Sequence, residues 1–308
     1  MADSEPPQYG PDTRIGFVGV GNMGGAVARR LASGGWTVKV YDPATAAAAR
    51  CAAAGAKVAT DLADAVRDAE LVITSLPTSE ILFDTTQQVL ASARPGITVV
   101  DVSTVDPTTA ERVAGLCQSA GVQFVSCPLG KGPAQAEQGE IPLFIGGEPH
   151  SVTRLGPLLA RIGNAVYDMG SVQAATTFKI VSNLIGMANL AVLVEGYAVA
   201  RQAGIPDQVF NEALKDTGAT SYQHQVRLPW VMNRDWSPRF GIDLALKDLR
   251  LAVDSACRWK IPVPVGSAAL AQLVAASAHG MGGEDVVALA KVVDPGLDVV
   301  PTVDETCS

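Results

Sequence analysis

The stretch "RIGFVGVGNMGGAVARRL", residues Arg14–Leu31, decides the fold. It begins with β-branched and aromatic residues, passes through closely spaced glycines and continues as an alanine-rich helical pattern. The glycines form Gly-x-Gly-x-x-Gly between a strand and a helix, which is typical of a dinucleotide-binding turn. Gly19 permits the tight turn, Gly21 lets the backbone approach a pyrophosphate, and Gly24 lets the helix pack on the strand. The sequence therefore predicts a dinucleotide site here.

The residues around this turn narrow the choice of cofactor. Asn22 and Met23 open the predicted helix, whose N-terminal N–H groups favour a phosphate, and we expect both residues at the cofactor. The next strand ends at Asp42, about 20 residues after the glycines, where a carboxylate can bind the ribose hydroxyls. That carboxylate would repel a 2′-phosphate, so we expect NAD rather than NADP, although Arg50 supplies a cation nearby. A glycine turn without a ligand is the alternative interpretation.

Strand and helix patterns alternate along the first half of the chain. The β-branched runs are RIGFVGV (14–20), TVKVYD (37–42), LVITSLP (71–77), ITVVDVS (97–103), VQFVSCP (122–128), IPLFIGG (141–147) and AVYDMG (165–170). This alternation predicts an α/β fold with a doubly wound, mainly parallel sheet over residues 14–171. Helical spacing dominates residues 172–293, which predicts an all-helical C-terminal domain. We expect a disordered leader over residues 1–13 and a mobile tail over residues 294–308.

Composition and charge exclude several classes of function. The chain has 308 residues, 48% of them hydrophobic, and a net charge of -8, so neither a nucleic acid nor an anionic membrane is an expected partner. Five widely spaced cysteines and three separate histidines indicate reduced thiols in the cytoplasm and no metal site. The N-terminus lacks the apolar core of a signal peptide, and no apolar stretch free of polar residues is long enough to span a bilayer. Small molecules and other proteins remain as partners.

Hydroxyl side chains at a predicted strand end form a second group of candidates. Ser103 and Thr104 follow the run ITVVDV, and ligands of open parallel sheets sit outside the carboxyl ends of the strands. Their hydroxyls could face a nicotinamide ring or a substrate carboxylate. Alternatively, Thr104 or Asp106 caps a helix that begins at Pro107. Both interpretations remain open at this point.

A long apolar helix pattern begins near "ATTFKIVSNLIG", residues 175–186, and carries one narrow polar stripe. Such a pattern predicts a buried helix whose polar stripe lines a cleft or a partner. Within the stripe, Lys179 and Asn183 are one turn apart and point the same way. A lysine in apolar surroundings can accept and donate a proton near neutral pH, although most helical lysines only reach from the surface into solvent. The whole stripe consists of Lys179, Ser182, Asn183, Gly186 and Asn189.

With these motifs, the chain resembles the β-hydroxyacid dehydrogenases from about residue 14 to residue 291. The matching segments are "GFVGVGNMG", "DVSTVDP", the Pro-x-x-x-Gly loop in "CPLGKGPAQAEQGEI", Lys-x-x-x-Asn on the apolar helix, and "LALKDLRLA". The resemblance implies a Rossmann-like sheet followed by an all-helical domain, with NAD as cofactor and a small anionic hydroxyacid or aldehyde as substrate. The apolar sides of the long helix need cover, which predicts a homodimer or tetramer through the helical domain.

The resemblance also implies roles for individual residues. It makes Lys179 the general acid/base, and Ser103 and Asn183 residues that hold the substrate. The residues that it places at the cofactor are Leu76, Pro77, Thr104 and Lys247. A surface ion pair with Asp243, four residues earlier on the same helix, is the alternative role for Lys247.

The chain departs from the family pattern in the substrate loop. Relatives commonly have Asp-Ala-Pro-Val-Ser-Gly-Gly, whereas this chain has "SCPLGKG" at residues 126–132. Gly130 replaces the usual serine, and Lys131 adds a cation before Gly132. We expect all three residues at the substrate, with Lys131 favouring a second carboxylate, a sulfonate or a phosphate. A solvated loop lysine is the alternative, in which case the substrate is a plain β-hydroxyacid.

The expected function is therefore an NAD-dependent interconversion of a β-hydroxyacid and its semialdehyde or keto form, similar to 3-hydroxyisobutyrate dehydrogenase. Three alternatives stay open. A reductase of an anionic aldehyde such as sulfolactaldehyde resembles this chain in its basic loop, but its asparagine and serine on the catalytic helix are matched here by Ser182 and Gly186. An imine reductase usually has aspartate or tyrosine in place of Lys179. A non-catalytic dinucleotide-binding scaffold would not need the pair of Lys179 and Asn183.

Overall fold

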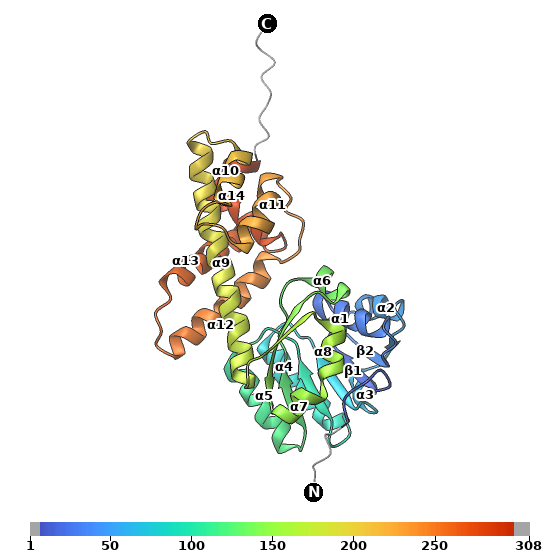
Figure 1. Ribbon diagram of the computed structural model, residues 1–308. Helices are drawn as coiled ribbons and strands as arrows, with labels where there is room; N and C mark the ends of the chain where they lie inside the picture. The colour runs from blue at the N-terminus through green and yellow to red at the C-terminus, as the bar shows by residue number, and fades with distance from the viewer. Residues whose placement is uncertain (1–6, 299–308) are drawn as a thin grey trace. The chain divides into compact units, whose positions relative to one another are not determined.

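The computed structural model describes residues 7–298, and its internal contacts divide the chain into two units (Figure 1). Unit 1 is Met1–Ile180 and unit 2 is Val181–Ser308. Helix α9 (Val172–Gln202) continues through this division, whereas the sequence pattern places the domain boundary at residues 171 and 172.

Unit 1 is built on an eight-stranded sheet with the order β3-β2-β1-β4-β5-β6-β7-β8. All pairings are parallel except the antiparallel pair of β6 and β7, so the mainly parallel, doubly wound sheet is confirmed. The short strand β3 was not predicted, because two residues carry no periodic pattern. The strands are β1 (Ile15–Val18), β2 (Val38–Tyr41), β3 (Lys57–Val58), β4 (Leu71–Thr74), β5 (Thr98–Asp101), β6 (Gln123–Ser126), β7 (Pro142–Gly147) and β8 (Ala165–Asp168).

Helices cover both faces of this sheet. Phe17 of β1 packs in one hydrophobic cluster with α1, α2, α6 and α8, and the next residue, Val18, packs in the other with α3, α4 and α5. Strands buried on both faces read as continuous apolar runs, which is why the sequence shows them clearly. The helices are α1 (Asn22–Ala32), α2 (Thr45–Ala52), α3 (Leu62–Val66), α4 (Ser79–Ser92), α5 (Pro107–Ser119), α6 (Pro133–Gln138), α7 (Pro149–Arg154) and α8 (Gly156–Ile162).

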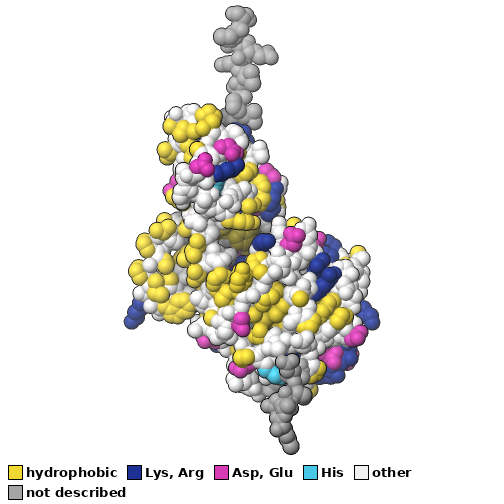
Figure 2. Space-filling model, viewed as in Figure 1, with side chains coloured by type: hydrophobic (Ala, Val, Ile, Leu, Met, Phe, Trp, Pro, Cys, Tyr) yellow, Lys and Arg dark blue, Asp and Glu magenta, His cyan; other side chains and the backbone are white. Residues whose placement is uncertain are grey.

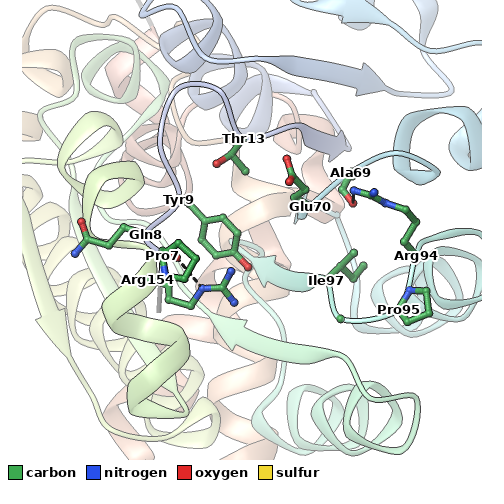
Figure 3. Close-up of a pocket in the computed structure, with 11 residues that line it drawn as sticks. Pro7, Gln8, Tyr9, Thr13, Ala69, Glu70, Arg94, Pro95, Ile97 and Arg154 are labelled. Atoms are coloured by element: carbon green, nitrogen blue, oxygen red, sulfur yellow. Dashed lines mark hydrogen bonds between the residues drawn. The ribbon is translucent and has the colours of Figure 1, made fainter. Parts of the chain in front are cut away.

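The segment before β1 packs against unit 1. Tyr9 is only 4% exposed, and its hydroxyl donates to Thr98 Oγ1 at 2.7 Å. The guanidinium of Arg154 lies 4.3 Å from the centre of the Tyr9 ring, and both residues line a cavity of about 550 Å³ (Figure 3). The predicted disordered leader is therefore wrong for residues 7–13, because burial of the Tyr9 ring fixes them; residues 1–6 lie outside the described residues.

Unit 2 is helical throughout its described residues, which confirms the all-helical C-terminal region. Its core joins Leu190 and Tyr197 of α9 with side chains of α12 and α13. Leu297 is 2% exposed, so the predicted mobile tail is wrong for residues 294–298, and residues 299–308 lie outside the described residues. After α9 follow α10 (Asp207–Leu214), η1 (Gln223–Arg227), α11 (Leu228–Met232), α12 (Ile242–Arg258), α13 (Pro264–Ala276), η2 (Ser277–Met281), η3 (Val286–Ala288), α14 (Leu289–Val293) and η4 (Pro295–Asp298).

Helix α9 is not buried on all of its apolar sides, which corrects the expectation from its sequence. Ile185 is 57% exposed, Val192 61% and Val199 71%. These residues recur every seven positions and so form one stripe along the helix. The other helices of unit 2 pack against a different side of α9, which leaves this stripe uncovered. Among the described residues, α9 is also the one helix that is long and apolar enough to cross a membrane, a weak criterion that core helices of soluble proteins also meet.

The packing of Tyr9 yields a prediction about stability. Tyr9→Ala should lower the free energy of unfolding by about 3 kcal/mol, because it removes a buried ring. Tyr9→Phe should lower it by only about 1 kcal/mol, because it removes one hydrogen bond. Urea titrations of both variants would measure these losses, with Tyr167→Ala as a control at a 53% exposed tyrosine. Equal stability of Tyr9→Ala and the wild-type protein would contradict the packing.

Candidate active site

The glycine turn between β1 and α1 is tightly packed at two of its three glycines and open at the third. Gly19 has a φ of +88°, and a Cβ atom there would lie 2.2 Å from the carbonyl oxygen of Ser75. A Cβ atom on Gly24 would lie 2.2 Å from the carbonyl oxygen of Gly19. Gly21, in contrast, is exposed, and a Cβ atom there would meet nothing within 4 Å. Packing thus requires the first and third glycines, while the second leaves open space in front of the N-terminus of α1.

Asp42 lies at the end of β2, directly beside this turn. Its Oδ2 accepts a hydrogen bond from the Val20 N–H at 2.8 Å, and its Oδ1 accepts one from the Ala44 N–H at 2.8 Å. The carboxylate therefore helps to fix the glycine turn while remaining partly exposed. Arg50, the cation that could favour a 2′-phosphate, is exposed and donates to the Ala46 carbonyl of its own helix at 3.3 Å.

Other predicted cofactor residues lie close to the same turn. Asn22 is the exposed first residue of α1, and Met23 packs partly against the core. Leu76 follows β4, and its Cδ2 atom would lie 3.1 Å from a Cβ atom on Gly19. Pro77, the next residue, is exposed. The fold thus brings the ends of β1 and β4 together, as the sheet order requires.

Ser103 is buried and uses its hydroxyl within the protein. Its Oγ donates to Asp101 Oδ1 at 2.6 Å and accepts a hydrogen bond from the Leu76 N–H at 2.8 Å. The Thr74 hydroxyl donates to the same Asp101 oxygen at 2.7 Å. A serine hydroxyl has one proton, so in this arrangement Ser103 retains only acceptor capacity for a ligand. Sequence reasoning missed Asp101, although an acidic residue at the end of an apolar strand was a visible signal.

The segment after β5 has two interpretations, a ligand contact or a helix cap, and the helix cap applies to Asp106. Asp106 caps α5, because its Oδ1 accepts a hydrogen bond from the Thr109 N–H at 3.0 Å and Pro107 follows as the first helical residue. Thr104 lies outside the helix and is partly exposed. Its contact with the cofactor stays a prediction.

The packing and backbone conformation of the substrate loop between β6 and α6 account for its departure from the family pattern. A Cβ atom on Gly130 would lie 2.5 Å from Cγ of Pro142, so the serine of relatives does not fit without a shift. Lys131 is exposed and has a φ of +57°, a backbone conformation that favours glycine. Its Nζ donates to the Glu140 carbonyl oxygen at 2.8 Å, so its ammonium group bonds to the loop itself. Gly132 is the N-cap residue of α6.

The polar stripe of α9 meets α12 within unit 2. Asn183 Nδ2 donates to Asp248 Oδ2 at 2.7 Å, and Lys247 Nζ lies 3.0 Å from Asp248 Oδ1. Asp248 is 3% exposed, so one buried carboxylate joins the residue expected at the substrate to a residue expected at the cofactor. Lys179 is partly buried and lies one helical turn before Asn183. The sequence showed Asp248 beside Lys247, but it did not reveal this bridging role.

Asp243, the alternative partner of Lys247, forms a hydrogen bond with another residue. Asp243 Oδ1 accepts a hydrogen bond from the Ser277 hydroxyl at 2.6 Å. The pairing of Lys247 with the adjacent, buried Asp248 draws its ammonium group toward Asn183 of α9. The contact of Lys247 with the cofactor and its ion pair with Asp243 both stay predictions.

Comparisons with known proteins agree with this geometry. Residues 14–170 match the NAD binding domain of 6-phosphogluconate dehydrogenase, and residues 173–293 match the NAD-binding domain of NADP-dependent 3-hydroxyisobutyrate dehydrogenase. The 2-(hydroxymethyl)glutarate dehydrogenase of Eubacterium barkeri is 29% identical over 91% of this chain and 94% of its own length. A probable 3-hydroxyisobutyrate dehydrogenase of Mycobacterium tuberculosis is 31% identical over 83% of this chain and 89% of its own.

A solved structure shows the same fold over nearly the whole chain. The 3-hydroxyisobutyrate dehydrogenase of Mycobacterium tuberculosis with L-serine superposes with a TM-score of 0.86, at 28% identity, over 92% of this chain and 99% of that one. The glycine turn, the doubly wound sheet, the helical second half and these matches lead to one conclusion. The chain belongs to the β-hydroxyacid dehydrogenase family and is an NAD-dependent oxidoreductase that acts on CH–OH groups.

Proposed function

We propose that this chain interconverts a β-hydroxyacid and its semialdehyde or keto form, with Lys179 as the general acid/base. The observation that carries the proposal is the bridge from Asn183 through Asp248 to Lys247. A buried carboxylate that accepts from an amide restricts the amide to one orientation. Asn183 is thereby held in place one turn from Lys179, as a residue that binds substrate beside a proton carrier must be. A non-catalytic scaffold would have no use for such an arrangement.

In the proposed reaction the protein moves the proton and orients the substrate. NAD, when bound, accepts or donates the hydride. In oxidation, neutral Lys179 Nζ takes the proton from the substrate hydroxyl; in reduction, its ammonium form stabilises the alkoxide oxygen and protonates it. Asn183 holds the substrate near this atom, and the loop at Lys131 and Gly132 receives the substrate carboxylate. Ser103 contributes an acceptor and ties together the two loops that follow β4 and β5.

A second copy of the chain is part of the proposal. Its support is the uncovered stripe of α9 together with exposed apolar residues around α13, where Val265 is 69% exposed and Ile261 is 54% exposed. Figure 2 shows hydrophobic side chains gathered around α13. Burial of such a surface against another copy removes apolar area from water. The proposed location is the cytoplasm, because the cysteines among the described residues are free thiols.

Removal of the proposed proton carrier tests the mechanism. Lys179→Ala should lower kcat by about 2 to 4 powers of ten, the range of general acid/base catalysis, while the affinity for NAD persists. Steady-state kinetics with 3-hydroxyisobutyrate and calorimetric titration with NAD would measure both. Lys215→Ala, at an exposed lysine of unit 2, serves as a control. Turnover retained by Lys179→Ala would rule out this lysine as the proton carrier.

Asp42 provides a test of cofactor choice. Asp42→Asn should narrow the preference for NAD over NADP, because it removes the repulsion of a 2′-phosphate. It should also weaken NAD binding modestly, since the carboxylate accepts from the backbone of the glycine turn. The ratio of kcat/KM for the two cofactors measures the first effect. An unchanged ratio would show that selectivity depends on other residues.

The exposed stripe of α9 provides a test of assembly. Val192→Asp should shift the protein from a homo-oligomer toward a monomer, because it places a charge in the proposed interface. Size-exclusion chromatography with light scattering would give the masses. The control is Val58→Asp, at a 50% exposed valine of strand β3. A monomeric wild-type protein, or an oligomer unaffected by Val192→Asp, would contradict the proposed interface.

A further inference from the structure

The π-helical turn η1 of unit 2 contains buried polar atoms that lack partners. Gln223 is 7% exposed, and its Oε1 is buried without a hydrogen-bond partner among the described residues. Arg227 follows four residues later, and its Nε and Nη1 atoms are also buried without a hydrogen-bond partner among the described residues. Buried polar atoms are rarely left unpaired in native proteins, and π-helical turns occur often at functional sites. This cluster therefore requires an explanation.

The neighbours of Arg227 do not neutralise its guanidinium group. The Phe240 ring lies 5.8 Å from Arg227 Cζ and offers only its π-face. Asp285 is buried, but its oxygens accept hydrogen bonds from the backbone N–H groups of Arg239, Phe240 and Val287. Burial lowers the pKa of Arg227, and the nearby carboxylate and Tyr222 only partly offset this effect. Arg227 is thus a partly buried cation, two of whose nitrogens lack hydrogen-bond partners among the described residues.

This cluster lies against the part of α9 that carries Asn183. Gln223 Nε2 would be 3.2 Å from a Cβ atom on Gly186, so the amide occupies the space left by the missing side chain. Gly186 follows Asn183 by three residues and belongs to the same polar stripe. Gln223 thus lies beside the polar stripe of α9, and Arg227 follows it by four residues on η1.

We propose that Arg227 and Gln223 form a subsite for a second anionic group of the substrate, a carboxylate or a sulfonate remote from the reacting carbon. The planar guanidinium can offer such a group two parallel hydrogen bonds, from Nη2 together with either Nε or Nη1, and its partial burial strengthens the contact. Lys131 is the competing candidate, but its ammonium group is exposed and already donates to Glu140. A dicarboxylic hydroxyacid of the kind named for the Eubacterium barkeri relative would fit this subsite. This inference rests on the proposed function.

The test compares a dianionic substrate, 2-(hydroxymethyl)glutarate, with a monoanionic one, 3-hydroxyisobutyrate, both with NAD. The wild-type protein should prefer the dianion. Arg227→Met should lower kcat/KM for the dianion about 10- to 100-fold, as expected for loss of a charge-assisted contact, and for the monoanion less than about threefold. Lys215→Met removes one cation from the exposed end of α10 and should preserve the preference.

Three results would overturn the subsite: no preference for the dianion in the wild-type protein, equal losses on both substrates in Arg227→Met, or a selective loss in Lys131→Ala alone. Arg227→Met should unfold at the same temperature as the wild-type protein or higher, because it replaces a partly buried guanidinium with two unpaired nitrogens by an apolar side chain. If it does not fold, Arg227→Lys keeps the charge but loses the planar fork, and a selective loss on the dianion is again expected.

A failure of the subsite can be distinguished from a failure of the proposed function. Lys179→Ala tests catalysis on both substrates, whereas the ratio between them tests Arg227. If the wild-type protein turns over neither compound, calorimetric binding of 2-(hydroxymethyl)glutarate to the NAD complex decides the question. Binding that is weakened about 10-fold or more by Arg227→Met supports the subsite, and binding unaffected by that change refutes it.

Discussion

The close approach of Gly19 to the end of β4 is the constraint on which the cofactor half depends. A side chain at Gly19 would collide with the Ser75 carbonyl, so the β1–α1 turn can form only where that position is glycine. The order of the sheet places β1 and β4 side by side, and their carboxyl ends therefore converge at one edge. Asp42 then fixes the turn from the other side through the Val20 N–H. The open space at Gly21 is a consequence of this packing.

In each unit, buried carboxylates order segments that lie far apart in the sequence, and Asp101 and Asp248 are two of them. Asp101 accepts hydrogen bonds from the hydroxyls of Thr74 and Ser103. Ser103 in turn accepts a hydrogen bond from the Leu76 N–H in the loop after β4. Asp248 accepts a hydrogen bond from the side-chain amide of Asn183 and forms an ion pair with Lys247. A buried charge is tolerated only where hydrogen bonds compensate its desolvation, so its partners are held firmly. Rigid placement of binding groups follows in both units.

Local patterns predicted the features of this chain that local physics determines. The β-branched runs, the glycine turn and the helix cap before Pro107 could be recognised because each depends on neighbouring residues. Tyr9 was misassigned to a disordered leader because its partner, Thr98, is 89 residues away. Asp248 was passed over for the same reason, since 65 residues separate it from Asn183. Pairings over such distances depend on how the helices pack, and no sequence period encodes them.

Lys131 and Arg227, the two cations considered for an anionic group of the substrate, differ in their solvation. Lys131 stands where relatives have glycine, and it keeps a glycine-like backbone while its exposed ammonium group bonds to Glu140. Water screens such a charge, so it discriminates weakly between substrates. Arg227 has lost much of its hydration without gaining hydrogen bonds at Nε and Nη1. In the proposed subsite, an anion would replace the missing interactions of Arg227, whereas an anion at Lys131 would displace water.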